Sequence, residues 1–225
     1  GINHSEMFPL FNQSGNNKLD FFQIWLNLPS YNKRVNPNFE IFWKDEIPKV
    51  DSNSNGNKNA EVELVAGNYL GFSAPIAPEN SWANDEKNDV AVWIIRLDKK
   101  GEFNIPNTES GANRNLYVLE GSNIKIDNQK ISKSAMAILD SSKKTTIKNF
   151  GTKTKLLLLQ GVPINEPVVK YGPFVMNSKS EIEQAFYDYN KTEFGGWKWG
   201  TPDPIHGIQK EKFAKLINGD VIKPL

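Results

Sequence analysis

The sequence predicts an all-β fold, a closed sandwich or barrel, with a short helix near the C-terminus. Short apolar segments recur along residues 62–160, and turns rich in Gly or Asn separate most of them. Many short strands at such spacing are typical of a closed β-structure rather than of alternating strands and helices. The chain has 225 residues, which is enough for one large all-β domain or two small ones.

The predicted strands of this region are rich in branched and aromatic residues and are bounded by turn-forming residues. A stretch of Asn, Ser, Asp, Gly and Lys at residues 51–59 predicts a solvated loop before them. The strands cover residues 62–66, 90–97, 115–120, 123–126, 135–139, 145–149 and 155–160.

A further strand is predicted from Leu19 to Leu28, and Pro29 ends it. Alternation places Phe22 and Leu26 on one face and Trp25 on the other. Because both faces carry large apolar side chains, we expect both to be covered.

Ser180 and Glu183 form a predicted capping box, with Ser at the N-cap and Glu three residues later. The helix is predicted at residues 181–189, and its apolar stripe is expected to pack on the barrel. That stripe consists of Ile182, Ala185, Phe186 and Tyr189. A last short helix is predicted at residues 210–218, ending at Gly219.

Composition excludes several classes of function. The 27 basic and 26 acidic side chains give a net charge of +1, which argues against a nucleic-acid partner. The absence of cysteine removes disulfides, thiolate metal sites and cysteine nucleophiles. Apolar runs such as residues 90–97 are far too short to cross a bilayer, so we expect no membrane partner and a cytoplasmic location. Because the first residue is Gly, we expect a processed or engineered start, which leaves a removed signal peptide open.

His4 and Glu6 are the candidate metal ligands. In an extended chain a spacing of two puts both side chains on the same face. An imidazole and a carboxylate on one face make half of a site for iron, manganese or zinc. The other histidine, His206, lies in a proline-punctuated loop, where a solvated or locally bonded role is the simpler interpretation.

Four motifs resemble the pirin family. They are His-Ser-Glu-Met at residues 4–7, Trp-Leu-Asn-Leu-Pro ending at Pro29, Pro-Ile-Asn-Glu-Pro ending at Pro167, and Gly-Pro-Phe-Val-Met-Asn ending at Asn177. A capped helix follows the last of them. The order and spacing match over nearly the whole chain, and the second and fourth motifs are specific only when they occur together.

The resemblance implies a cupin fold, a jelly-roll β-barrel, present twice in pirins. It also implies a non-haem iron held by three histidines and a glutamate in the first barrel. His4 would be the third histidine, and Glu6 the glutamate and a possible catalytic base. On this interpretation residues 1–35 end the first, metal-binding barrel, and residues 36–225 form the second barrel with the C-terminal helix.

Two departures from the pirin pattern bear on activity. The first His-x-His pair would lie upstream and is not in this sequence, so we expect impaired metal binding unless a neighbouring chain or a longer native protein completes the site. The second barrel would need His-x-His shortly before residues 116–121. Residues 110–114 read Ser-Gly-Ala-Asn-Arg instead, and Asn113 is no substitute for imidazole. The second barrel is therefore expected to be metal-free.

Three functions stay open at this point. The resemblance implies an iron-dependent dioxygenase of the quercetin type, acting on a small aromatic substrate. Alternatives are a binding or regulatory module and an inactive remnant. If most strands of the first barrel are missing, the strand from Leu19 to Leu28 has an unpaired edge, and exposed edges pair with other chains. We therefore also expect a homo-oligomer that buries this strand.

Overall fold

The computed structural model describes residues 1–51, 56–201, 204–205, 211–216 and 218–224. The chain forms two compact units. The first unit joins Gly1–Ile41 to Glu166–Leu225, and the second is the continuous segment Phe42–Asn165. The first unit is therefore built from both ends of the chain.

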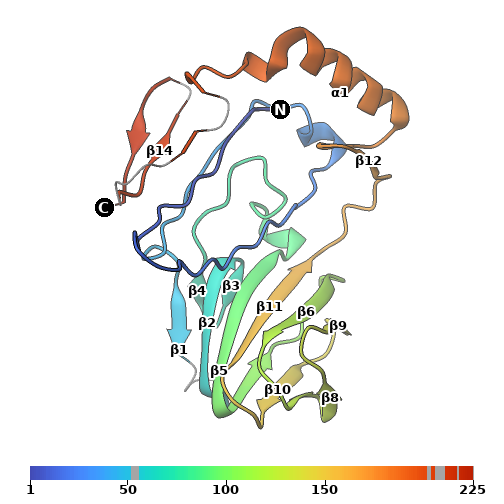
Figure 1. The fold of residues 1–225 in the computed structure, drawn as a ribbon. Helices are drawn as coiled ribbons and strands as arrows, with labels where there is room; N and C mark the ends of the chain where they lie inside the picture. The colour runs from blue at the N-terminus through green and yellow to red at the C-terminus, as the bar shows by residue number, and fades with distance from the viewer. Residues whose placement is uncertain (52–55, 202–203, 206–210, 217, 225) are drawn as a thin grey trace. The chain divides into compact units, whose positions relative to one another are not determined.

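The second unit is a nearly closed antiparallel β-barrel (Figure 1). Its nine-stranded sheet has the order β8-β7-β10-β5-β11-β6-β9, and β2 joins β5 to β1. The strands of this sheet are β1 (Lys49–Asp51), β2 (Lys58–Ala66), β5 (Ala91–Ile105), β6 (Asn113–Glu120), β7 (Ile124–Ile126), β8 (Gln129–Ile131), β9 (Met136–Leu139), β10 (Thr145–Asn149) and β11 (Thr154–Gly161). A two-stranded hairpin, β3 (Asn68–Tyr69) with β4 (Phe72–Ser73), and the short helix η2 (Glu86–Asn88) complete the unit.

The long strand β5 organises the barrel because it pairs with three other strands. Residues 91–97 pair with β11 and residues 92–97 with β2. Residues 102–105 pair with β10, and Glu102 also pairs with Lys58 of β2. The sequence predicts only the first half, since the polar run from Asp98 to Glu102 is typical of a turn. Phe103 and Ile105 are fully buried, and their burial holds the second half in the sheet.

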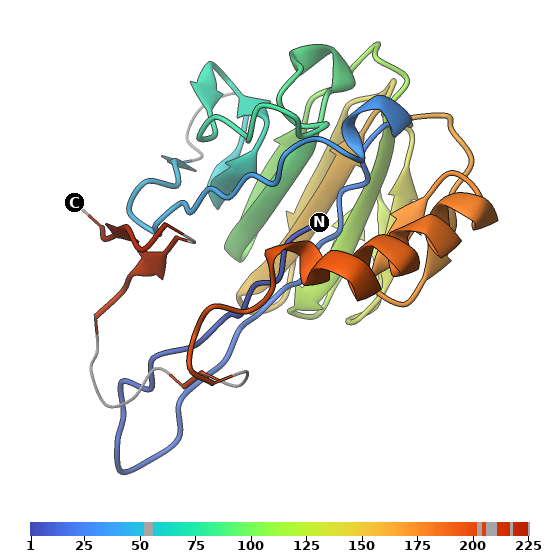
Figure 2. The same cartoon turned by 90° about the horizontal axis from the view of Figure 1, so that it is seen from above.

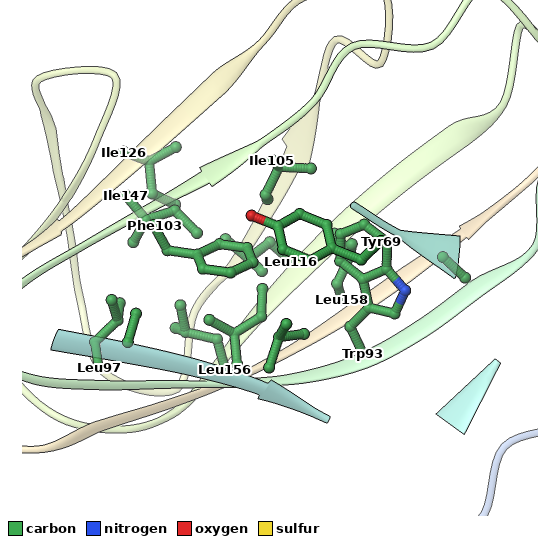
Figure 3. Close-up of a cluster of buried hydrophobic side chains, with 14 of the residues drawn as sticks. Tyr69, Trp93, Leu97, Phe103, Ile105, Leu116, Ile126, Ile147, Leu156 and Leu158 are labelled. Carbon is green, nitrogen blue, oxygen red and sulfur yellow. The ribbon is translucent and has the colours of Figure 1, made fainter. Parts of the chain in front are cut away.

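The core lies between the inward faces of these strands (Figure 3). Tyr69 stacks on Phe103 with 5.2 Å between ring centroids and meets Trp93 edge-on at 5.1 Å. The Tyr69 hydroxyl accepts a hydrogen bond from Asn57 Nδ2 at 2.7 Å and donates one to the Asn104 carbonyl at 3.1 Å. Burial raises the pKa of this phenol, so it stays neutral and satisfies both partners.

In the first unit, α1 (Lys179–Thr192) is the only α-helix among the described residues, and it is the orange helix of Figure 2. The predicted helix 181–189 lies within it. Its stripe packs on the hairpin of β12 (Val169–Tyr171) and β13 (Phe174–Met176), where Phe186 meets Phe174 edge-on at 4.9 Å between centroids. Docking of the stripe on the barrel stays a prediction. The short helices η1 (Ser30–Asn32) and η3 (Glu193–Gly195) belong to the same unit.

The predicted N-cap of α1 is wrong by two residues. Ser178 is the cap: its hydroxyl accepts a hydrogen bond from the Glu181 amide at 3.2 Å. The Glu181 carboxylate in turn accepts one from the Asn177 amide at 2.9 Å. Ser180 lies inside the helix instead, because the chain is still extended at Ser178 and turns helical directly after it.

The strand predicted from Leu19 to Leu28 is not formed, and residues 1–29 contain no strand. A strand needs a neighbouring backbone to complete a ladder of hydrogen bonds, and this segment belongs to none of the sheets among the described residues. The expectation that both faces are covered is also wrong, because Trp25 is 55% exposed on one face and Leu26 is 44% exposed on the other. Lys170 Nζ lies 4.7 Å from the Trp25 ring centroid and partly covers it.

The helix predicted at residues 210–218 is wrong for the described part of that range. Residues 214–215 form β14 (Ala214–Lys215), which pairs with β15 (Val221–Ile222). Gly219, with φ of 96°, makes the turn between them. Residues 210 and 217 lie outside the described residues. No helix in the described part of the chain is long and apolar enough to cross a bilayer.

Candidate functional site

The structure brings the two predicted metal ligands together in the first unit. His4 Nε2 lies 3.9 Å from Glu6 Oε1, and the side chains are 63% and 54% exposed. The segment is not a strand, but the two side chains lie on the same side of it. Two metal bonds of about 2.1 Å can span this separation, and exposed side chains rotate freely to adjust it.

The types of donor fit iron or another transition metal, but the set is incomplete. Imidazole nitrogen and carboxylate oxygen are ordinary ligands of such ions. Within the residues that the structure describes, no group of three or more His, Cys, Asp or Glu side chains could hold an ion. His4 and Glu6 are therefore not part of a larger group of possible ligands among the described residues, and His206 lies outside these residues.

The carboxylate of Glu166, in the motif that ends at Pro167, is hydrogen-bonded to Ser30, which follows one motif, and to Asn177, which ends another. One carboxylate oxygen accepts hydrogen bonds from the Ser30 amide at 2.7 Å and from Asn177 Nδ2 at 2.8 Å, and the other accepts one from the Ser30 hydroxyl at 3.0 Å. Nearby, Lys33 Nζ donates to Asn27 Oδ1 at 2.7 Å. These hydrogen bonds connect Ser30 to Glu166, before the β12–β13 hairpin, and through Glu166 to Asn177, after it.

A cavity of about 440 Å³ lies at one end of the barrel, in the second unit. Arg114 and Gln160 line it and face each other in register on β6 and β11. Arg114 Nε donates to Gln160 Oε1 at 2.6 Å, and Gln160 Nε2 donates to the Asp89 carbonyl at 3.2 Å. Burial lowers the pKa of the Arg114 guanidinium, although the charges of Asp89 and Asp140 oppose that shift.

A comparison with protein families shows to which family the chain is related. The family model described as the pirin C-terminal cupin domain matches residues 92–195. This chain belongs to the pirin family.

Individual relatives support the assignment to the pirins. Pirin-1 of Arabidopsis thaliana is 30% identical over 200 residues, covering 87% of this chain and 63% of the relative. A Vibrio cholerae protein, named provisionally as a quercetin 2,3-dioxygenase, is 32% identical over 201 residues, covering 86% of this chain and 64% of the relative. A crystal structure of quercetin 2,3-dioxygenase from Acinetobacter baumannii matches with a TM-score of 0.63 and 29% identity, over 76% of this chain and 55% of that chain.

These comparisons confirm the predicted family and the cupin barrel. This pirin spans about three fifths of the length of the curated relatives that it matches, 64% of the Vibrio protein for example. The division into residues 1–35 and 36–225 and the metal-free second barrel stay predictions.

Sequence reasoning missed two functional candidates in this pirin, Glu166 and Arg114. Glu166 stands in a recognised motif, but its partners Ser30 and Asn177 are far from it in sequence. In the sequence, Arg114 only ends a stretch without histidine. Its alternation with Leu116 and Val118 indicates that this charged residue lies on the inward face of β6.

The Glu166 contacts make the stability of the first unit depend on pH. Burial disfavours the charged carboxylate, but the hydrogen bonds from Ser30 and Asn177 outweigh it and hold the pKa of Glu166 below its ordinary value. This stabilisation is complete above the unfolded-state pKa and is lost as pH falls through the lower folded-state pKa. We expect Glu166→Gln to flatten the acid limb of the stability curve.

The measurement is urea unfolding between about pH 3 and pH 6, where a normal glutamate titrates. Glu183→Gln is the matched control, because Glu183 is an exposed residue of α1 in the same unit. An acid limb of the same slope in the wild type and in Glu166→Gln would contradict this role.

Proposed function

We propose that this pirin serves metal-dependent dioxygenation of a small aromatic substrate of the flavonol type. His4 and Glu6 are two of the metal ligands in this proposal, and a neighbouring chain or a longer native protein supplies the others. The observation that carries it is the approach of His4 Nε2 to within 3.9 Å of Glu6 Oε1. The names of the Vibrio and Acinetobacter relatives support the reaction class.

The chemistry follows from the two side chains. A bound iron would hold substrate oxygens and organise their reaction with dioxygen. His4 would contribute an imidazole nitrogen, and Glu6 a carboxylate oxygen whose negative charge offsets that of the cation. The Glu6 oxygen that does not bind the metal would accept a proton from a phenolic hydroxyl of the substrate.

Oxygen uptake with quercetin tests the proposal. We expect iron-dependent consumption by the wild type and a loss on the order of 100-fold or more in His4→Ala and in Glu6→Gln. Glu40→Gln is the matched control, since Glu40 is an exposed carboxylate in the same unit. Uptake that is equal in all four proteins would remove His4 and Glu6 from the site. No uptake by the wild type would contradict the enzymatic proposal.

A binding or regulatory module is the second candidate. The observation that favours it is the set of exposed apolar side chains between Leu19 and Leu26. Exposed apolar surface of this kind commonly marks an interaction site. A pirin that consumes no oxygen with quercetin but binds a protein through this segment would fit this candidate.

We also propose self-association through the segment from Leu19 to Leu28. Ile24 is 42% and Leu26 44% exposed in this segment. Pairing with a second copy would bury these side chains. We expect a dimer or larger oligomer in light scattering, and a monomer for the double variant Ile24→Asp, Leu26→Asp. A wild-type monomer at every concentration, with fast amide exchange in this segment, would contradict the proposal.

A further inference from the structure

The cavity at the end of the barrel is lined by three inward-facing residues of adjacent strands. Trp93 lies on β5, Gln160 on β11 and Arg114 on β6. Gln160 is in register with Ala91 on one side and with Arg114 on the other. The pairing of these strands therefore holds the three side chains at the same end of the barrel. Figure 3 shows one of them, Trp93, beside Tyr69 of the apolar core.

Two hydrogen-bond donors at this end lack a partner. Arg114 is 2% exposed and Trp93 3% exposed. Arg114 Nη1 and Trp93 Nε1 are both buried and receive no acceptor from the described residues. A buried donor without an acceptor costs free energy, and a buried charge without a counter-charge costs more. Native proteins seldom keep two such groups beside a cavity without a ligand or water to satisfy them.

The carboxylate of Asp89, which lines the cavity, is already hydrogen-bonded to two other side chains. Asp89 Oδ2 accepts hydrogen bonds from the Thr108 hydroxyl and the Ser110 hydroxyl, each at 2.6 Å. No described carboxylate lies within ion-pair distance of Arg114, whose one hydrogen bond goes to the neutral amide of Gln160. The charges of Asp89 and Asp140 act on the guanidinium, but its Nη1 donor is left without an acceptor among the described residues.

We propose that this cavity binds a small organic monocarboxylate with an apolar body. A carboxylate offers two acceptor oxygens, which match the guanidinium nitrogen of Arg114 and the indole nitrogen of Trp93. Asp85, Glu86 and Asp89 also line the cavity and disfavour a ligand with several negative charges. The volume falls within the roughly 300–1,000 Å³ of small-molecule sites. The apolar lining comes from Ala74, Pro75, Ile76, Ala83, Val90 and Pro106.

This site lies in the second unit, whereas His4 and Glu6 belong to the first. The proposal therefore stands or falls independently of the dioxygenase proposal.

Titration of the whole chain with benzoate tests the site, and benzamide is the neutral probe of similar shape. Calorimetry gives the affinities, and ¹⁵N NMR follows the indole signals of the six tryptophans. The Trp93 signal is the one that disappears in Trp93→Phe. We expect saturable benzoate binding that shifts this signal, and benzamide binding at least about tenfold weaker, because a charged hydrogen bond is lost.

Variants separate the guanidinium from the rest of the barrel. Arg114→Met keeps an unbranched side chain but removes the guanidinium, and it is expected to weaken benzoate binding at least about tenfold. Trp93→Phe keeps a ring in place and is expected to weaken it several-fold. Arg96→Met is the matched control, since Arg96 lies on β5 and pairs outside the cavity with Glu61 and Glu63.

Three results would overturn the proposal. They are no saturable benzoate binding, equal affinity for benzoate and benzamide, and unchanged affinity in Arg114→Met or Trp93→Phe. If Arg114→Met does not fold, the benzamide comparison and Trp93→Phe still decide the matter.

Discussion

Phe103→Ala is expected to destabilise the barrel by about 3–5 kcal/mol. The Phe103 side chain is fully buried and stacks on Tyr69 at 5.2 Å between centroids. Its removal loses apolar burial and opens a hole that strands of a hydrogen-bonded barrel cannot close. The loss also frees the Tyr69 ring, whose hydroxyl bonds Asn57 and the Asn104 carbonyl.

Chemical denaturation followed by near-ultraviolet circular dichroism measures this change. Phe72→Ala is the matched control in the same unit, because Phe72 is 51% exposed and its loss is expected to cost less than about 1 kcal/mol. A cost for Phe103→Ala no larger than that of Phe72→Ala would show that the core is not organised around the Tyr69–Phe103 stack.

Gly67→Ala is expected to destabilise the same unit by about 2–4 kcal/mol. Gly67 has φ of +84°, and a Cβ there would lie 2.5 Å from the Val90 carbonyl oxygen and 3.1 Å from Ala91 Cα. Both contacts are with backbone at the start of β5, which β2 and β11 hold in place. The clash therefore adds to the ordinary cost of a left-handed alanine.

Gly71→Ala separates the two contributions. Gly71 has φ of +83°, but nothing lies within 4 Å of an added Cβ. It therefore carries only the conformational cost, about 1 kcal/mol. Thermal or urea unfolding of both variants gives the difference directly. Equal losses would mean that the β2–β3 connection relaxes without moving β5.

The barrel could be predicted from the sequence because its signals are local. Alternation of apolar residues and turn residues between them locate most strands, and the bounds predicted for β10 match the structure. The continuation of β5 past Asp98 could not be predicted, because its support comes from the buried contacts of Phe103 and Ile105 with distant strands.

The wrong predictions concern the segment from Leu19 to Leu28, the N-cap of α1 and the residues on either side of Gly219. The segment from Leu19 to Leu28 has strand-like composition, but composition does not supply a neighbouring backbone. Two overlapping Ser-x-x-Glu patterns precede α1, and the direction of the chain leaving β13 selects Ser178 over Ser180. At residues 214–222, pairing across Gly219 overrides helical propensity.

The candidate site also has features that the sequence predicts and features that it does not. A spacing of two was enough to suggest that His4 and Glu6 act together. The contacts of Glu166 with Ser30 and Asn177 join residues that are far apart in sequence. The pairing of Arg114 with Gln160 needs the register of β6 on β11, which no local pattern contains.

The metal content of protein purified without chelator tests the central claim that His4 and Glu6 are metal ligands. Elemental analysis of the wild type is compared with the double variant His4→Ala, Glu6→Ala. The account predicts about one iron, manganese or zinc ion per chain in the wild type and none in the double variant. A wild type without metal, or a double variant that keeps its metal, would contradict it.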